Sequence, residues 1–214
     1  MNEFWRRMAA RLGDEFEAFC RASDMPASVG VRLRRAPEGW FDEFCPRPVP
    51  WHPDGLTLAR RPNFTLDPLF HAGGYYVQEP SSMIVYQAAA GVVGRESRVL
   101  DLCAAPGGKT TLLLALEPAV VVANEPIASR LPALTTNLAK FAAVNAVVSR
   151  ADPEAFDKPC FDFVLVDAPC SGEGLWRKTP EARRQWSSRM VAACAARQAR
   201  ILDAAYRALK PGGR

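Results

Sequence analysis

A glycine-rich stretch with a cysteine and a lysine, Leu100–Thr111 (LDLCAAPGGKTT), is the first place where this sequence could do chemistry. A phosphate-binding loop would need a glycine five positions before its Gly-Lys pair, and Cys103 occupies that position. We therefore interpret the stretch as an apolar strand over Val99–Leu102 that turns tightly at the glycine pair into a helix beginning near Lys109. Turns of this kind hold nucleoside cofactors.

Two acidic residues farther along the chain suit the same kind of ligand. Glu125 lies 18 residues beyond Gly107, close to the offset of about 20 residues at which an acid accepts hydrogen bonds from ribose hydroxyls. Asp152, in the stretch SRADPEAF, either accepts a hydrogen bond from an adenine amino group or caps a turn. The sequence leaves both interpretations of Asp152 open.

The stretch DAPCSG, residues 167–172, carries a third set of reactive side chains. Asp167 ends an apolar run, and Cys170 follows it by three residues. A cysteine beside a ligand site becomes a nucleophile when a helix N-terminus or a lysine lowers its pKa. The alternative is a buried, inert thiol, which is the commoner state of an isolated cysteine.

The elements that must position these residues alternate between strand and helix. Apolar runs predict strands over 98–102, 119–124, 146–150 and 161–166, with helices over 109–116 and 186–209. Continuous apolar strands that alternate with helices indicate an α/β fold with a parallel sheet covered on both faces. Ligands of such sheets bind beyond the carboxyl ends of the strands. The glycine-rich loop, Glu125, Asp152 and DAPCSG are therefore expected to converge on one site.

Two further helices have predicted starting points. One is expected from Ser81 or Ser82, because a serine hydroxyl caps the first turn of a helix well. The other is expected from Pro126, since proline suits a first helical position, whereas Pro132 should kink or restart that helix. Both helices lie within the alternating part of the chain.

The chain before this alternating part has a different character. Residues 1–25 carry aromatic and apolar side chains at helical spacing, which predicts one or two helices. Residues 26–74 are rich in proline and glycine, and the short runs SVGVRL and GLTLA predict strands there. We expect residues 1–74 to form a small α+β arm and residues 75–214 to form the main domain.

Composition excludes several classes of protein. Charged residues make up 23% and hydrophobic residues 49% of the chain, and no apolar run approaches the roughly 20 residues that span a bilayer. We therefore expect a cytoplasmic protein without a membrane partner. The six cysteines include no CxxC pair, and there are only two histidines, so neither a metal site nor a disulfide framework is expected.

Positive charge is concentrated at the end of the sequence. Residues 177–214 hold ten lysines or arginines and two acids, within a chain whose formal net charge is +4. Such a basic segment beside a ligand site suits a phosphate backbone. A solvated helix face is an equally good interpretation of the charges alone.

Four successive stretches together resemble a known family. LDLCAAPGGKTT, ANEPIASR, FDFVLVDAPCSGEGLWRK and RQARILDAAYRALKPGG are similar, in this order, to motifs of the Sun-type RNA cytosine-5 methyltransferases. The similarity is greatest to the bacterial 16S ribosomal RNA branch, in which YYVQEPSSM also has a counterpart. The resemblance covers residues 75–214 well and the preceding residues loosely.

The resemblance implies a Rossmann-like class I methyltransferase sheet that uses S-adenosyl-L-methionine. It implies that Glu125 holds the ribose of this cofactor, that Asp152 reads its adenine, and that Asp167 lies between cofactor and target base. The residues implied to surround the methionine end and the sugar are Cys103, Ala104, Ala105, Pro106, Gly107, Gly108 and Lys109.

The family's chemistry uses two cysteines. One thiolate adds to C6 of cytosine, which makes C5 able to attack the sulfonium methyl group, and the other assists breakdown of the adduct. Cys170 matches the second cysteine, while Asp167 and Lys109 are implied to orient the base or to help proton transfer. The attacking cysteine normally follows LKPGG by one strand. We therefore expect these 214 residues to be truncated before the nucleophile, with an incomplete sheet whose fourth strand has an unpaired edge.

The implied function is methyl transfer to carbon 5 of cytosine in RNA, ribosomal RNA first and transfer RNA second, by a monomer in which the arm helps to recognise RNA. Trp176, Arg177 and Lys178 are interpreted as a loop that stacks on RNA and neutralises it, rather than as packing residues. The alternative function is a non-catalytic RNA-binding or assembly module that retains the cofactor fold, because the attacking cysteine is absent from these residues.

Overall fold

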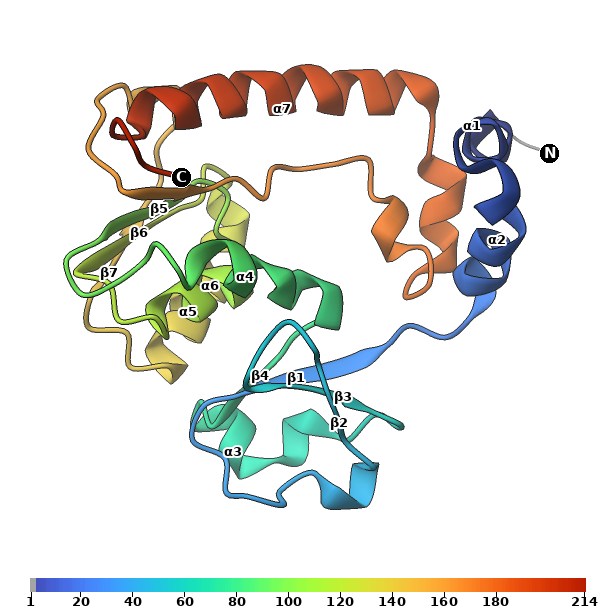
Figure 1. Cartoon of the computed structure of the whole chain (residues 1–214), viewed down its shortest axis with the longest axis horizontal. Coiled ribbons are helices and arrows are strands. Elements are labelled where there is room, and N and C mark those ends of the chain that lie inside the picture. The colour runs from blue at the N-terminus through green and yellow to red at the C-terminus, as the bar shows by residue number, and fades with distance from the viewer. Residues whose placement is uncertain (1–2) are drawn as a thin grey trace. The chain divides into compact units, whose positions relative to one another are not determined.

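The computed structural model describes residues 3–214, which form two compact units (Figure 1). The first unit joins the described residues up to Ala27 with Pro169–Ala199. The second unit joins Ser28–Ala168 with Arg200–Arg214. The second unit therefore contains both the strands of the expected arm and the expected parallel sheet. The boundary expected at residue 74 stays a prediction.

The first unit is helical and has an aromatic core. Its elements are α1 (Glu3–Leu12), α2 (Phe16–Asp24), the start of α7 (Ser188–Ala208) and the 3₁₀ turns η1 (Gly13–Glu15), η7 (Glu173–Leu175) and η8 (Pro180–Gln185). The ring of Phe4 lies 4.4 Å from that of Trp176 and 5.6 Å from that of Trp186, measured between centroids. Trp176 is buried, so the interpretation of its ring as an RNA-stacking surface is wrong.

The second unit begins with an antiparallel sheet. Its strands are β1 (Val29–Leu33), β2 (Arg47–Pro48), β3 (Gly55–Leu58) and β4 (Tyr75–Val77), in the order β2-β3-β1-β4. The turns η2 (Asp42–Phe44) and η3 (Phe64–Leu66) and the helix α3 (Pro68–His71) cover the sheet. Asp67 caps α3 by accepting from the N–H of Leu69. Val31, Phe41 and Tyr75 are buried at the centre of this small core.

A parallel sheet forms the rest of the second unit, as the sequence predicts. Its strands are β5 (Arg98–Asp101), β6 (Val120–Asn124), β7 (Ala146–Ser149) and β8 (Phe163–Leu165), in the order β7-β6-β5-β8. Leu100 on β5 stands opposite Val122 on one neighbour and Val164 on the other. The connecting elements are η4 (Pro80–Ile84), α4 (Val85–Ala89), α5 (Gly108–Leu114), η5 (Ala128–Arg130), α6 (Leu131–Lys140) and η6 (Pro153–Ala155).

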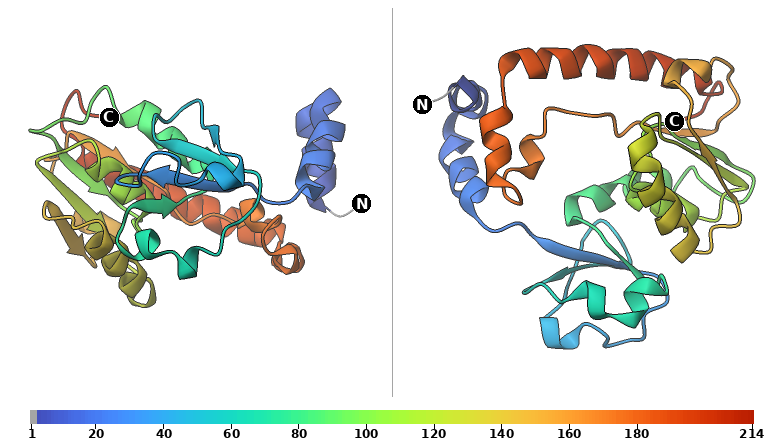
Figure 2. Two further views of the ribbon diagram at one scale, coloured as in Figure 1. Left: turned by 90° about the horizontal axis from the view of Figure 1, so that it is seen from below. Right: turned by 180° about the vertical axis from the view of Figure 1, so that it is seen from behind.

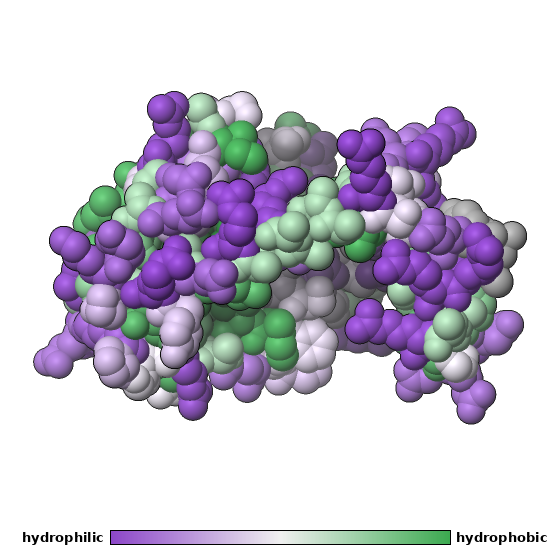
Figure 3. All heavy atoms as spheres, turned by 90° about the horizontal axis from the view of Figure 1, so that it is seen from above, coloured by the Kyte–Doolittle hydropathy of each residue, from purple (hydrophilic) through white to green (hydrophobic). Residues whose placement is uncertain are grey.

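Both faces of the parallel sheet are covered, because successive strand residues point to opposite sides. Leu100 packs with Ile201 and Ala205 of α7, whereas Val99 packs with Leu113 of α5 on the other face. Figures 1 and 2 show the end of α7 on one side of the sheet and α4, α5 and α6 on the other. The surface seen from the α7 side is mostly hydrophilic (Figure 3). No helix among residues 3–214 is long and apolar enough to cross a membrane.

The helix start predicted at Pro126 is wrong, and the helix cap predicted at Ser81 or Ser82 is not formed. The helix expected from Pro126 is preceded by a 3₁₀ turn and begins as α6 at Leu131, with Pro132 in its first turn, where the missing proline N–H costs no hydrogen bond. The helix expected from the serines begins as the 3₁₀ turn η4, without a side-chain cap. The hydroxyl of Ser81 donates instead to the carboxylate of Glu79.

Residues after α7 lie along β8 and partly fill its edge. Phe161 and Leu209 form a parallel bridge, and the N–H of Val164 donates to the carbonyl of Arg214 at 2.8 Å. A side chain at Gly213 would come within 3.0 Å of the backbone carbonyl of Asp162. The prediction of an unpaired edge is therefore wrong at Val164.

Candidate cofactor-binding site

A cavity of about 230 Å³ lies within the second unit at the carboxyl ends of β5 and β8. It combines the loop after β5, the residue Asp167 after β8, and residues of β4 and η4 from before the parallel sheet. Its lining residues are Tyr76, Val77, Gln78, Glu79, Ser82, Asp101, Cys103, Ala104, Ala105, Pro106, Gly108, Lys109 and Asp167. All the loop residues predicted from the sequence except Gly107 thus line one cavity.

The glycine pair lets this loop pack closely on both sides. Gly107 has φ of +106°, a conformation that side chains rarely allow. A Cβ at Gly108 would stand 3.0 Å from Cε1 of Tyr76. The N–H of Ala104 donates to the carbonyl of Asn124, which ties the loop to the neighbouring strand β6. The loop backbone is therefore held against both the sheet and β4.

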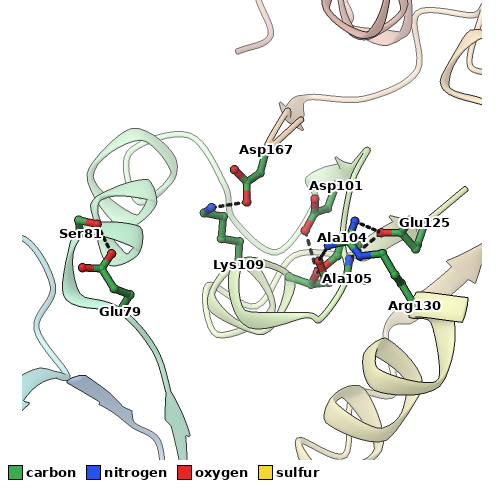
Figure 4. A network of polar contacts seen from close by, with 10 residues as sticks. Glu79, Ser81, Asp101, Ala104, Ala105, Lys109, Glu125, Arg130 and Asp167 are labelled. Carbon is green, nitrogen blue, oxygen red and sulfur yellow. Dashed lines mark hydrogen bonds and ion pairs between the residues drawn. The ribbon is translucent and has the colours of Figure 1, made fainter. Parts of the chain in front are cut away.

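An ion pair closes one side of the cavity. The ammonium of Lys109, on α5, donates to the carboxylate of Asp167, beyond β8 (Figure 4). The Lys109 side chain is 22% exposed and the Asp167 side chain is 56% exposed. Opposite charges from two separate elements are thus brought together where the sequence predicts a reactive site.

Asp101 is a buried carboxyl group that no local pattern in the sequence indicates as a site residue. Its Oδ2 accepts from the hydroxyl of Thr110 at 2.7 Å, whereas Oδ1 is buried and has no hydrogen-bond partner among the described residues. Burial, helped by the nearby charge of Asp167, raises the pKa of Asp101 to about 6 against the opposing effect of the hydrogen bond from Thr110. An unsatisfied buried carboxylate oxygen in the cavity lining is suited to a cationic ligand.

Cys103 contributes a neutral thiol to the cavity lining. It is 7% exposed. Burial, together with the charges of Asp101 and Glu125, raises the pKa of this thiol to about 12. Cys103 is therefore protonated at neutral pH and is a poor nucleophile. Cys103 lies in the lining of the cavity, and its role in binding a cofactor stays a prediction.

Glu125 is fully buried next to the loop, but it does not line the cavity. Its carboxylate accepts from the N–H groups of Ala105 and Ile127, at 3.3 and 3.0 Å. Arg130 forms an ion pair with it at 3.2 Å and also donates to the carbonyl of Ala105. Figure 4 shows this group beside Asp101. The ribose-binding role of Glu125 stays a prediction, and its ion pair with Arg130 has no local signal in the sequence.

Asp152 and Cys170 are both exposed, and neither lines the cavity. Asp152 accepts from the N–H of Glu154 at 3.0 Å and caps the turn η6, which confirms the capping interpretation. Its reading of adenine stays a prediction. Cys170 belongs to the first unit, so its catalytic role also stays a prediction. Among residues 3–214 no three His, Cys, Asp or Glu side chains are grouped to hold a metal ion.

A buried arginine lies behind the cavity and was missed from the sequence. Arg32, on β1, donates from Nε to Oε1 of Gln78 at 2.9 Å and from Nη2 to Oγ1 of Thr111 at 2.7 Å. Gln78 lines the cavity and Thr111 lies on α5. The stretch YYVQEPSSM is the sequence signal for this wall, and it predicts a helix cap at Ser81 or Ser82 but no ligand-binding residue.

Comparison with known proteins places the chain in a family. A family model described as 16S rRNA methyltransferase RsmB/F matches residues 93–214, and a model for the N-terminal domain of 16S rRNA methyltransferase RsmF matches residues 1–80. The structure of NSun6 from Pyrococcus horikoshii with SFG superposes with a TM-score of 0.81 at 16% identity, over 100% of this chain and 81% of that chain. That likeness concerns the fold. The fold is that of a Rossmann-like methyltransferase domain.

Sequence relatives place the chain more narrowly. It is 35% identical over 218 residues to ribosomal RNA small subunit methyltransferase F of Erwinia tasmaniensis, covering 94% of this chain and 45% of the relative. It is 38% identical over 238 residues to the protein of the same name from Aeromonas hydrophila, covering 99% and 49%. The chain belongs to the RsmB/F family of 16S rRNA methyltransferases. It spans about half the length of these curated relatives.

Proposed function

We propose that the cavity binds S-adenosyl-L-methionine and that the protein transfers its methyl group to carbon 5 of a cytosine in RNA, with ribosomal RNA as the substrate. The observation that carries the proposal is the unpartnered Oδ1 of Asp101 in a cavity built by the loop Cys103–Lys109. The proposal includes a cytoplasmic monomer that needs no metal. Membership in the RsmB/F family supports the reaction and the class of RNA.

The residues of the cavity fit this cofactor chemically. S-adenosyl-L-methionine supplies a methyl group on a positively charged sulfonium and also carries an ammonium group. Asp101 offers a buried carboxylate oxygen that accepts no hydrogen bond from the described residues, which suits a cation. The glycine pair exposes loop backbone for close approach of a ligand. We assign Asp101 and the loop Cys103–Lys109 to the methionine end, and Glu125 and Asp152 to the nucleoside.

The reacting base needs activation, because C5 of cytosine is a weak nucleophile. In the proposed reaction a cysteine thiolate adds to C6, which makes C5 nucleophilic, and loss of the C5 proton after methyl transfer lets the thiolate leave. We assign the Lys109–Asp167 pair to orienting the base and moving its proton, and Cys170 to assisting release of the adduct. The attacking cysteine of the family follows the LKPGG motif, so none of the six cysteines here is assigned that role.

Isothermal titration with S-adenosyl-L-methionine tests the cofactor proposal. We expect saturable binding, weakened at least about tenfold in Asp101→Asn, because the neutral amide cannot pair with a cation. The matched control is Glu96→Gln, which neutralises an exposed acid of the same unit outside the cavity. A folded chain that bound no cofactor would contradict the proposal and would leave the non-catalytic RNA-binding alternative.

A further inference from the structure

A second cavity in the same unit is distinct from the cofactor cavity. It has a volume of about 370 Å³ and lies between the end of β1, the end of α5 and the residues after α6. It shares no lining residue with the cofactor cavity. Three arginines, Arg32, Arg34 and Arg35, line it together with the ring of Phe141. The function proposed above gives these residues no role.

The backbone brings the three arginines to one place. Arg32 and Arg34 are two residues apart, so strand alternation puts them on the same side of the chain. After β1 ends at Leu33, the N–H groups of both Arg34 and Arg35 donate to the carbonyl of Gly74, at 3.0 and 2.9 Å. Because both N–H groups bind one carbonyl, the strand alternation of side chains ends here, and Arg35 lines the same cavity as Arg32 and Arg34.

The guanidinium groups of Arg32 and Arg34 lie over the same aromatic ring, and that of Arg32 is only partly hydrogen-bonded. The Cζ atoms of Arg32 and Arg34 lie 5.7 and 5.0 Å from the centroid of the Phe141 ring. Arg32 is 1% exposed. Its Nε and Nη2 are hydrogen-bonded, whereas its Nη1 has no hydrogen bond to any residue of 3–214. Burial and the neighbouring charge of Arg35 lower the pKa of Arg34.

The acids around this cavity do not balance the arginines. Within the described part of the chain none of the three arginines forms an ion pair. Two acids, Asp54 and Glu117, also line the cavity, but the carboxylate of Glu117 is held by Arg95 at 3.0 Å. The cavity therefore keeps surplus positive charge in a partly buried place, which favours an anionic ligand.

We propose that this cavity binds a phosphodiester group of the RNA, an inference that rests on the function proposed above. Guanidinium groups match phosphate geometry with paired N–H donors. A volume of about 370 Å³ is within the range that holds a small ligand, so it accommodates a phosphate with part of its sugar. The site adds a sequence-independent contact away from the cofactor cavity and helps to hold the RNA in register.

Fluorescence anisotropy with a labelled single-stranded RNA oligonucleotide, measured on the 214-residue chain at several salt concentrations, tests the proposal. The test variant is Arg34→Gln with Arg35→Gln, which leaves the buried Arg32 in place. We expect about tenfold weaker binding and a salt slope reduced by about 0.7 for each lost phosphate contact. The matched control is Arg60→Gln with Arg61→Gln, which removes two exposed charges that lie outside the cavity.

The control variant should change RNA affinity by no more than about twofold. Equal losses in the two double variants would overturn the proposal, because the charge effect would then be delocalised. Titration with inorganic phosphate distinguishes a free anion: phosphate binding that is lost in Arg34→Gln with Arg35→Gln, without any change in RNA affinity, would also overturn it. Cofactor titration of the same samples separates a failure of this site from a failure of the proposed methyltransferase function.

Discussion

At the scale of single residues, Asp101 gives the folded chain a dependence on pH. The pKa of an aspartate in an unfolded chain is about 3.9, and burial raises that of Asp101 to about 6. Between these values the folded state holds a proton that the unfolded state releases. The contribution of Asp101 to the free energy of unfolding should therefore be complete below about pH 4. It should be lost as pH rises through about 6, and the loss should be about 3 kcal/mol at most. Urea unfolding of Asp101→Asn should lack this component, and that of Glu96→Gln should retain it.

Cofactor binding should depend on pH in the opposite direction. The ionised carboxylate of Asp101 attracts a cation, whereas the protonated acid does not. The affinity for S-adenosyl-L-methionine should therefore increase as pH rises toward about 6 and then level off, and in Asp101→Asn it should be weak and flat. Isothermal titration across this range measures both profiles. If Asp101→Asn kept the wild-type dependence of cofactor affinity on pH, the titrating group would be a residue other than Asp101.

The reactive loop could be predicted from the sequence because its signal is local. The glycine pair, the preceding apolar run and the lysine are neighbours in the chain, and the structure places Gly108 and Lys109 at one cavity. Asp101 and Arg130 had no such signal. The burial of Asp101 depends on neighbouring strands, and the ion pair of Arg130 depends on Glu125 lying within reach after a turn. Packing, rather than residue spacing, determines these two roles.

At the scale of elements, Arg32 connects the antiparallel sheet to the loop helix α5. It bonds Gln78 and the side chain of Thr111, 79 residues away in sequence, so no local pattern predicts the contact. Arg32→Met keeps the approximate length of the side chain but leaves these acceptors without a donor. We expect a loss of about 3 kcal/mol in the free energy of unfolding, measured with urea, and weaker cofactor binding because Gln78 lines the cavity.

The matched control for this prediction is Arg61→Met. Arg61 lies over the ring of Phe64 and is exposed, so its replacement should change the free energy of unfolding by less than about 1 kcal/mol. If both variants were equally stable, the hydrogen bonds of Arg32 would not hold the two sheets together. A weaker affinity of Arg32→Met for the cofactor would then come only from the lost hydrogen bond to Gln78.

The order of strands and helices could be predicted from the sequence, whereas the residues at which the helices begin could not. Apolar runs and the alternation with helices predict the parallel sheet, since burial on both faces requires such runs. Helix starts depend on competing local geometries, as at Pro126, where the chain makes a 3₁₀ turn before α6. The burial of Trp176 depends on Phe4, which is distant in sequence. Contacts between residues so far apart in the sequence produce no periodic pattern from which they could be predicted.

At the scale of the whole molecule, the two compact units predict a local response to the cofactor. A ligand stabilises the part of the chain that binds it, by about 2.7 kcal/mol at a concentration one hundred times its Kd. Every residue that lines the cofactor cavity belongs to the second unit. Saturating S-adenosyl-L-methionine should therefore slow amide exchange in residues 101–114 and 76–82. The amides of α1 and α2 in the first unit should exchange at unchanged rates.

Hydrogen-exchange mass spectrometry of the free and bound chain measures this pattern, with Asp101→Asn as the control that should lose the protection. The aromatic core of the first unit, centred on Phe4 and Trp176, contains no residue of the cavity, and its stability should not change with the cofactor. Equal protection of α1, α2 and the loop would show that the units unfold as one. In that case the cofactor would also stabilise the first unit, which contains Cys170. Cofactor binding would then affect the reactivity of Cys170 through folding stability, and not only because Cys170 is close in sequence to residues of the cavity.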